Sequence, residues 1–201
     1  MGRSEDCTFD GLAWAKMQTG TLQDIILTDK WGRNSNIETN SCGVGCKQAK
    51  LNQQSHTELF WNIPCGEFDE NLVRSYGASI RYNIDFDGQT PDKGYICAAI
   101  RGGKSTYFST CSKIPESKTL AGFELHEHGF MQTNNKQVTR ERFMMALAQC
   151  KSISVRAHFN ADTTRVRISN VHYGKAIESR DESQAVSTVE QCTCPVGYEG
   201  K

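Results

Sequence analysis

Apolar and polar residues alternate along the middle of the chain. In the stretch ASIRYNIDFDG, residues 78–88, every second side chain is apolar: Ile80, Tyr82, Ile84 and Phe86. A period of two is the pattern of a β-strand that buries one of its faces. We therefore predict a half-buried strand here.

Further short strands are predicted on both sides of this one, with turn residues between them. GYICAAI and TYFSTC, residues 94–100 and 106–111, flank an Arg-Gly-Gly-Lys turn and predict a hairpin. The other strand candidates are LFWNI (59–63), FELHEH (123–128), SISVRAHF (152–159) and TRVRIS (164–169). Short strands at this spacing indicate an all-β protein with an antiparallel β-sandwich.

One segment has a helical pattern instead. VTRERFMMALAQCK, residues 138–151, starts with Thr139 as a plausible N-cap. Phe143, Leu147 and Cys150 then fall on one helical face. We predict a single short helix that covers one end or edge of the sandwich.

The last two strand candidates, 152–159 and 164–169, predict a second hairpin with a definite register. If the turn centres on Ala161-Asp162, the apolar pairs are Val155–Ile168, Ala157–Val166 and Phe159–Thr164. These pairs would form one mainly apolar face directed at the core.

The same register would gather positive charge on the opposite face of that hairpin. Arg156 would lie opposite Arg167, and His158 opposite Arg165. Like charges across a ladder destabilise it slightly, so something should offset them. We favour an acidic side chain of a neighbouring strand, for example Glu124. The alternative is a basic docking face for a sulfated glycan or an acidic partner.

Composition and charge narrow the class of protein. The 201 residues are 37% hydrophobic and 23% charged, which is typical of a globular chain. Lys plus Arg and Asp plus Glu both total 23, and a net charge of zero argues against nucleic acid as the main partner. No apolar run approaches the roughly 20 residues of a membrane span. The start, MGRSEDCTFD, lacks the apolar core of a secretory signal.

Nine cysteines favour an extracellular protein whose signal peptide lies upstream. They are scattered through the chain without the C-x-x-C pairs of a zinc site: Cys7, Cys42, Cys46, Cys65, Cys97, Cys111, Cys150, Cys192 and Cys194. In a strand-rich chain this distribution indicates disulfides and an oxidising compartment.

The bonding partners of these cysteines can be predicted only in part. Cys97 and Cys111 bracket the Gly102-Gly103 turn, so we predict a disulfide there, with buried thiols as the alternative. Cys42, Cys46 and Cys65 are further candidates. Seven cysteines precede residue 180, so at least one of them is free or bonded outside the domain. The candidates for this odd cysteine are Cys7 and Cys150.

Two parts of the chain resemble known extracellular modules. The ending C-x-C-P-x-G-Y-x-G, which runs from Cys192 to Gly200, resembles the resumption of a laminin-type EGF-like module. The body resembles the laminin IV type A (laminin B) domain of laminin α and γ chains and perlecan. The matching stretches are LFWNIP, NLVRSYGASIRYNI, FELHEHGF, VTRERFMMALAQCKSISVRAHFN and RISNVHYGKA. Together the resemblances cover roughly residues 59–200 and predict a laminin IV type A domain over 1–180 and the start of an EGF-like module over 188–201.

The resemblance carries expectations about fold and function. It implies a jelly-roll β-sandwich similar to carbohydrate-binding modules, without enzymatic activity or a cofactor. It implies a structural and interaction role in a secreted basement-membrane protein, with neighbouring EGF-like modules as partners. Cys192 and Cys194 lie too close together for a relaxed bond with each other. We therefore expect their partners in the same EGF-like module, beyond Lys201 or before Met1.

Possible metal ligands occur at three places. His126 and His128 would lie on one face of a strand and could hold zinc, but no third ligand is evident, and a polar strand face ending at Gly129 is the favoured interpretation. The loop DFDGQTPD, with Asp85, Asp87 and Asp92, resembles the start of an EF-hand. The twelfth position of that motif holds Ile96 instead of a glutamate, so we interpret the loop as a connection between two strands.

A structural calcium is the third possibility. Jelly rolls similar to carbohydrate-binding modules often hold one between their first and last strands, for which Asp10 and Asn170 are the candidates here. A solvated aspartate and a turn asparagine are the favoured interpretation.

The leading alternative function is carbohydrate binding. Trp14, Trp31 and Trp61 could form a stacking platform, although Trp61 lies in an apolar strand and is expected in the core. Such a platform needs two coplanar aromatics on one concave face. No G-x-S-x-G nucleophile motif and no N-x-S/T glycosylation site occur, and Asn40-Ser41-Cys42 is only the rare sequon variant.

Overall fold

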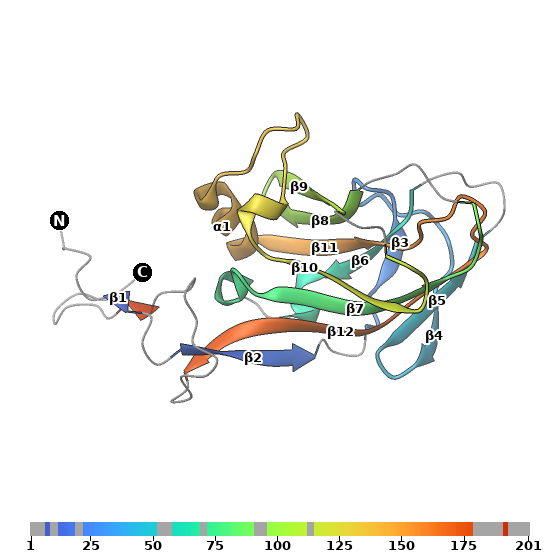
Figure 1. Ribbon diagram of the computed structural model, residues 1–201, viewed down its shortest axis with the longest axis horizontal. Coiled ribbons are helices and arrows are strands. Elements are labelled where there is room, and N and C mark those ends of the chain that lie inside the picture. The colour runs from blue at the N-terminus through green and yellow to red at the C-terminus, as the bar shows by residue number, and fades with distance from the viewer. Residues whose placement is uncertain are drawn as a thin grey trace.

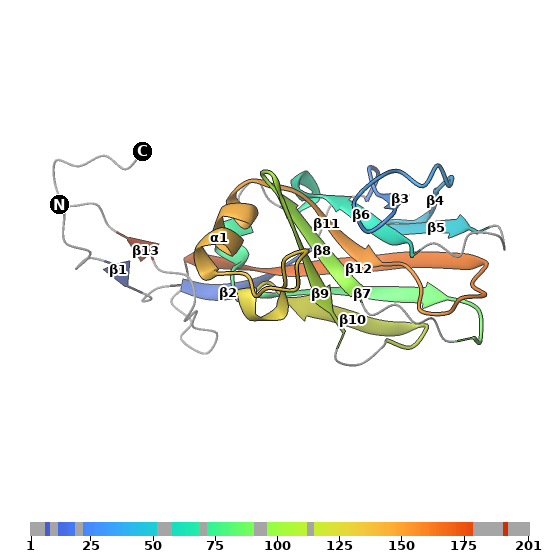
Figure 2. The ribbon, with the colours of Figure 1, turned by 90° about the horizontal axis from the view of Figure 1, so that it is seen from above.

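Two antiparallel sheets form the body of the protein. The computed structural model describes residues 7–8, 12–18, 22–51, 58–68, 72–90, 96–111, 115–178 and 191–192. The two sheets lie face to face as layers, as Figures 1 and 2 show from two directions. The all-β antiparallel sandwich predicted from the strand pattern is confirmed.

The six-stranded sheet is organised around one long strand, β12 (Arg165–Glu178). Along one edge β12 pairs with β7, and along the other it pairs first with β5 and then with β2. Strand β10 extends the sheet beyond β7, and β4 extends it beyond β5. The bounds are β2 Leu12–Gln18, β4 Asn40–Gly43, β5 Cys46–Lys50, β7 Ser79–Phe86 and β10 Thr119–Glu124.

The five-stranded sheet has the order β3-β6-β11-β8-β9. Its strands are β3 Ile26–Thr28, β6 Phe60–Pro64, β8 Ile96–Gly102, β9 Ser105–Thr110 and β11 Cys150–Arg156. Strands β8 and β9 form the predicted hairpin, and Gly103 occupies its turn with φ of +58°. A positive φ is a conformation that glycine adopts without steric cost.

The core lies between the sheets and explains the alternation in the sequence. Ile80, Tyr82, Ile84 and Phe86 of β7 are all buried. They meet the inward residues of the five-stranded sheet, including the fully buried Trp61. Each strand therefore contributes every second side chain to one shared interior.

Helix α1 (Arg140–Ala148) covers one end of the sandwich, as predicted (Figure 1). The Thr139 side chain caps it by accepting from the backbone N of Arg142 at 3.4 Å. Phe143 and Leu147 are fully buried beneath it. A Cβ on Gly102 would lie 2.1 Å from the carbonyl oxygen of Ala146, so this glycine lets the helix backbone pack closely on β8.

Three 3₁₀ helices and one separate strand pair complete the described elements. The helices are η1 Cys65–Glu67, η2 Leu72–Ser75 and η3 Glu127–Gly129. Strand β1 (Cys7–Thr8) pairs with β13 (Gln191–Cys192), beyond the end of the sandwich at which β2 lies (Figure 1). None of the helices in the described ranges is long and apolar enough to cross a membrane.

The predicted hairpin over 152–169 is wrong. β11 pairs with β6 and β8, whereas β12 pairs with β7, β5 and β2, so the two strands belong to different sheets. The chain between them crosses from one sheet to the other. The apolar residues are nevertheless all buried in the shared core: Val155, Ala157, Phe159, Val166 and Ile168.

Side-chain hydrogen bonds to the loop after β7 hold this crossing connection. Asp87 Oδ1 accepts from the backbone N atoms of Thr164 and Arg165, at 2.6 and 2.9 Å. Asp162 Oδ1 accepts from the backbone N atoms of Gln89 and Thr90, both at 3.0 Å. Two loops are thus tied by reciprocal carboxylate–backbone contacts. Asp87 serves as a strand-connection residue, and Asp92 lies outside the described residues.

Candidate functional site

Three disulfides cross-link the sandwich. Cys97 and Cys111 form the bridge predicted across the β8–β9 hairpin, with Cα atoms 5.5 Å apart. Cys42–Cys46 closes the β4–β5 turn, and Cys65–Cys150 joins η1 to the start of β11. Cys150 is therefore bonded, and the expectation that it could be the odd cysteine was wrong. The helix ends at Ala148, so Cys150 lies on a strand next to Cys65.

Two further cysteines, Cys7 and Cys192, lie in the separate strand pair. In the β1–β13 register Cys7 is the Cα partner of Cys192. Cys194 lies outside the described residues. The expectation that Cys192 and Cys194 bond within an EGF-like module stays a prediction, and the register adds Cys7 as a candidate partner for Cys192.

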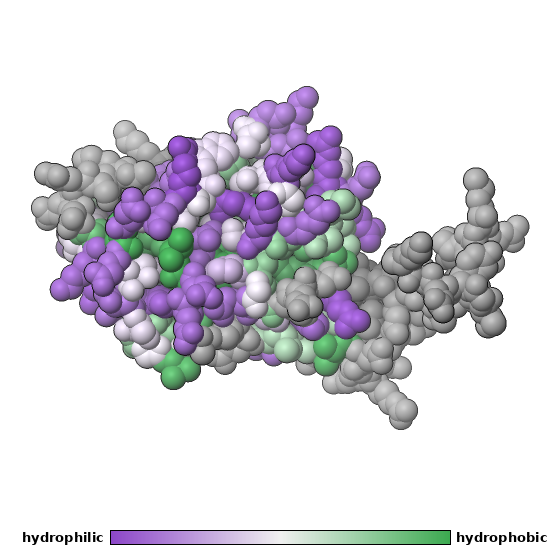
Figure 3. All heavy atoms as spheres, turned by 180° about the vertical axis from the view of Figure 1, so that it is seen from behind, coloured by the Kyte–Doolittle hydropathy of each residue, from purple (hydrophilic) through white to green (hydrophobic). Residues whose placement is uncertain are grey.

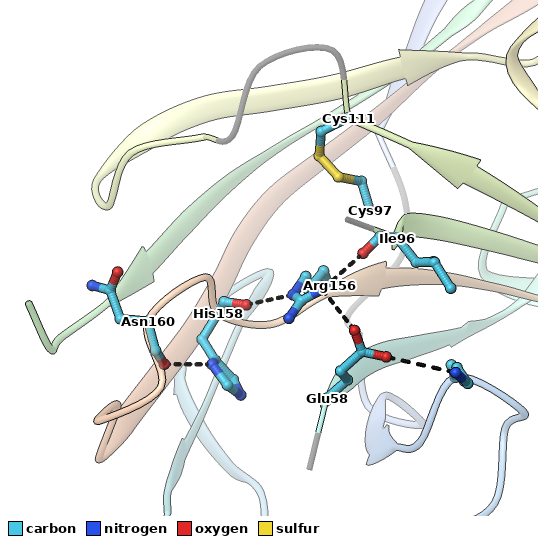
Figure 4. A network of polar contacts seen from close by, with 8 residues as sticks. Glu58, Ile96, Cys97, Cys111, Arg156, His158 and Asn160 are labelled. Atoms are coloured by element: carbon cyan, nitrogen blue, oxygen red, sulfur yellow. Dashed lines mark hydrogen bonds and ion pairs between the residues drawn. A yellow bond between two sulfur atoms is a disulfide. The ribbon is translucent and has the colours of Figure 1, made fainter. Parts of the chain in front are cut away.

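The predicted basic docking face does not form one surface. Arg156 is fully buried and His158 is 5% exposed, on the side of the molecule formed by the five-stranded sheet. Figure 4 shows the Arg156 guanidinium held by Glu58 Oε1, which accepts at 3.2 Å, and by the carbonyls of His158 and Ile96 at 2.8 and 3.3 Å. This arginine is a buried, paired structural residue and is not available to a partner.

The other two members of that face lie on the six-stranded sheet. Arg165 and Arg167 are exposed, with Lys50 opposite Arg165 and Asp85 opposite Arg167. The acidic neighbour is therefore Asp85. Glu124 pairs with Ser79 at the far end of β7, so it was the wrong candidate.

The tryptophans that could bind a sugar are not arranged for stacking. Trp61 is fully buried in the core, as expected. Trp31 is 44% exposed and meets Phe108 edge-on, with centroids 5.2 Å apart and an interplanar angle of 86°. The side chain of Trp14 lies outside the described residues. Among the tryptophans that the structure describes, no coplanar pair forms a platform.

Trp31 instead belongs to a loop that is fastened over the outer face of the five-stranded sheet. Arg101 donates to the carbonyl oxygen of Lys30 at 2.7 Å and to Ser154 Oγ at 2.6 Å. Asp29 Oδ1 accepts from the backbone N of Trp31 at 2.8 Å. These contacts hold the loop against the sheet. Ser154 and Phe108, which lie beneath the loop, are buried.

The surface seen from behind is mainly hydrophilic, with several separate apolar spots (Figure 3). Large exposed apolar side chains in the described residues include Val44, Leu120 and Met145. These three lie on the β4–β5 turn, on β10 and on α1 respectively.

The structure describes one of the two calcium candidates. Asn170 is exposed in the irregular part of β12 and has φ of +52°, a conformation that asparagine tolerates in turns. Its backbone N donates to the carbonyl oxygen of Gly45 at 3.2 Å. Asp10 lies outside the described residues, so the calcium site stays a prediction.

The segment His126–His128 does not continue the strand that the sequence predicted. β10 ends at Glu124, and His126 caps the short helix η3. This turn gathers His126, Glu127 and His128, whose potential ligand atoms all lie within 4.8 Å of one another. The two imidazole centroids are 4.5 Å apart. On a strand, Glu127 would have pointed to the opposite face.

Tyr76 contacts two members of this cluster, Glu127 and His126. Its hydroxyl donates to Glu127 Oε2 at 2.5 Å, and its ring stacks on His126 at 5.2 Å. Burial, followed by the hydrogen bond to Glu127, raises the pKa of Tyr76 to about 12. Burial alone would raise the pKa of Glu127, but hydrogen bonds from Tyr76 and from the backbone, together with the two neighbouring imidazoles, outweigh it and lower that pKa. Glu127 is thus a buried carboxylate kept ionised.

Comparison with known proteins gives consistent results. The sequence model of the family Laminin B (Domain IV) matches residues 60–190. A basement membrane-specific heparan sulfate proteoglycan core protein from Mus musculus is 25% identical over all of this chain. The chain spans only 6% of that relative.

A solved laminin domain has the same fold. The L4b domain of human laminin alpha-2 is 18% identical, with a TM-score of 0.66, and the match covers 80% of this chain and 96% of that chain. A family 11 carbohydrate-binding module of Clostridium thermocellum is 11% identical, with a TM-score of 0.43, and the match covers 89% of this chain and 97% of that chain. The second likeness is too distant to support any argument about a ligand.

Proposed function

Because the chain belongs to the Laminin B (Domain IV) family, we propose that it is a non-catalytic structural and interaction module of a secreted basement-membrane protein. The observation that carries this proposal is the family match together with a sandwich cross-linked by three disulfides. Disulfides of this kind persist in oxidising, extracellular compartments. The polar outer faces suit a module that stays folded by itself between neighbouring modules.

The relation of the module to its host chain follows from its strand pairs. β2 pairs with β12, and β1 pairs with β13, so the incoming and outgoing segments run side by side. We propose that residues 1–180 are the laminin IV type A domain and that 188–201 begin a laminin-type EGF-like module. A domain built in this way projects from its host at one point.

Carbohydrate binding remains the alternative function, but no specific observation favours it. It requires two aromatics in parallel planes on an open sheet face. The described tryptophans are either buried or edge-on to their neighbour, and a fastened loop covers the face of the five-stranded sheet.

Deletion from a host chain tests the proposal. Residues 12–178 would be replaced by a short Gly-Ser linker in a host that includes the flanking modules, and both forms would be secreted from animal cells. We expect equal secretion and unchanged disulfides in the flanking modules, but reduced deposition in the basement-membrane matrix. Deposition equal to that of the intact host would contradict an interaction role. Intracellular retention of the shortened host would contradict an independently folded insert.

A further inference from the structure

We infer that His126, Glu127 and His128 form a binding site for a divalent transition-metal ion, with zinc as the best match. The donor set is two imidazole nitrogens and one carboxylate oxygen, a combination that proteins use for Zn²⁺. Nitrogen donors make calcium and magnesium poor occupants, because these ions prefer oxygen ligands. This inference goes beyond the structural role of the module and does not depend on it.

The geometry requires only a small adjustment. The ligand atoms already lie within 4.8 Å of one another, whereas tetrahedral zinc with bonds of about 2.0–2.1 Å separates its donors by roughly 3.4 Å. His128 is exposed, so a change of its side-chain torsions can close the difference. Glu127 and His126 are more enclosed and provide the fixed part of the site.

Tyr76 prepares both fixed ligands. Its hydroxyl donates to Glu127 Oε2 at 2.5 Å and lies 3.4 Å from His126 Nε2. When His126 Nε2–H donates to the Tyr76 oxygen, Nδ1 carries the lone pair, and this atom is 3.5 Å from Glu127 Oε2. Without metal, Nδ1 accepts from the backbone N of His128 at 3.4 Å, so a bound ion would replace this long hydrogen bond. A hydrogen-bond partner behind Glu127 and behind His126 is the outer-shell arrangement that orients metal ligands in proteins.

The site is open to solvent on one side. A hollow of about 400 Å³ is lined by Ser109, Phe123, Glu124, His126, His128 and Gly129. It gives an ion a route to the two imidazoles. Water, or the Glu124 carboxylate that lines the same hollow, can supply the fourth ligand of a tetrahedral ion.

Zinc titration of the untagged, disulfide-intact chain tests the site directly. After dialysis against a chelator, calorimetry with ZnSO₄ should show one ion bound per chain. Zinc-edge X-ray absorption should show nitrogen and oxygen ligands near 2.0 Å with imidazole scattering. Affinity should fall at acid pH, because the imidazoles must be neutral to bind metal. The absence of zinc uptake at neutral pH would overturn the inference.

Matched variants separate this site from adventitious binding by surface histidines. His128→Gln and the double variant His126→Gln/His128→Gln should lose zinc binding, while His172→Gln, on another face, should keep the wild-type affinity. Tyr76→Phe keeps the ring but removes the hydroxyl, and it should weaken zinc binding about 10- to 100-fold. Unchanged affinity in the double variant, or an equal loss in His172→Gln, would overturn the assignment.

Discussion

At the scale of single residues, Asp87, which directly follows β7, holds the start of β12 and the end of the loop that leads into it. Its carboxylate accepts from the backbone N atoms of Thr164 and Arg165 and from Thr164 Oγ1 at 2.6 Å. Burial alone would raise the pKa of Asp87, but these hydrogen bonds outweigh it and lower that pKa. The ionised form is therefore the one that the fold stabilises.

This environment predicts a pH-dependent contribution to stability. Asp87→Asn should lower the free energy of unfolding by about 2 kcal/mol at neutral pH, because charge-assisted hydrogen bonds are lost. Since the folded pKa lies below the ordinary value of about 3.9, the contribution is complete above that value and is lost as the pH falls through the folded pKa. Urea unfolding at several pH values would measure the difference between wild type and variant. If the difference in free energy of unfolding between wild type and Asp87→Asn stayed constant down to pH 2, this account would be contradicted. Asp85→Asn is the matched control.

Arg156 and Arg165 provide a second contrast between single residues. Arg156 is fully buried and paired with Glu58, whereas Arg165 is exposed on the six-stranded sheet. Arg156→Met should destabilise the fold by about 3 kcal/mol, because it removes the buried ion pair to Glu58 and the hydrogen bonds to two carbonyls. Arg165→Met should change stability by less than about 0.5 kcal/mol. Chemical denaturation would compare the two, and equal losses would show that Arg156 is not a structural residue.

At the scale of elements, the disulfides differ in the length of chain that they close. Cys65–Cys150 spans 85 residues, Cys97–Cys111 spans 14 and Cys42–Cys46 spans 4. Constraint of the unfolded chain predicts contributions of about 4.5, 3 and 2 kcal/mol respectively. Paired Cys→Ala variants should therefore lose stability in that order in urea unfolding. The order would be refuted if the Cys42/Cys46 pair proved the most damaging to remove.

Periodicity identified most strands, but it did not identify their partners. The alternation in 79–86 reports one buried face, which a strand has wherever it lies in the sandwich. The segments 152–159 and 164–169 look like a hairpin, because a hairpin and a crossing between sheets both show two alternating strands and a polar turn. The true partners are distant in sequence: β6 and β8 for the first segment, and β7, β5 and β2 for the second. The density of Asn, Asp and Thr in 160–164 was the available sign of a connection held by side chains.

Only part of the candidate metal site could be predicted from the sequence, because the turn that completes it was not recognised. The two histidines were recognised, but a strand would place Glu127 on the opposite face. Only the turn into η3 brings the carboxylate to the imidazoles. Tyr76 lies about fifty residues earlier, and no local pattern connects it to them.

At the scale of the whole molecule, the β1–β13 pair would form the base of the module in the proposed host. Cys7 is the Cα partner of Cys192, and directly paired positions of antiparallel strands suit a disulfide. We predict this bridge in the secreted chain. Peptide mapping under non-reducing conditions would detect the linked peptides, and Cys7→Ala should leave Cys192 open to alkylation. Finding Cys7 alkylatable in the intact wild type would exclude the bridge.

The side-by-side arrangement of β1 and β13 also decides what happens when the host protein is stretched. Tension that arrives along β1 leaves along β13, so a bond between these strands lets the force pass without entering the sandwich. If that pair opens, pulling separates β2 from β12 starting at one end, and the ladder is unzipped bond by bond instead of being sheared as a whole. Inserted in a host as proposed, the module would therefore carry no tension for as long as the β1–β13 pair stays closed.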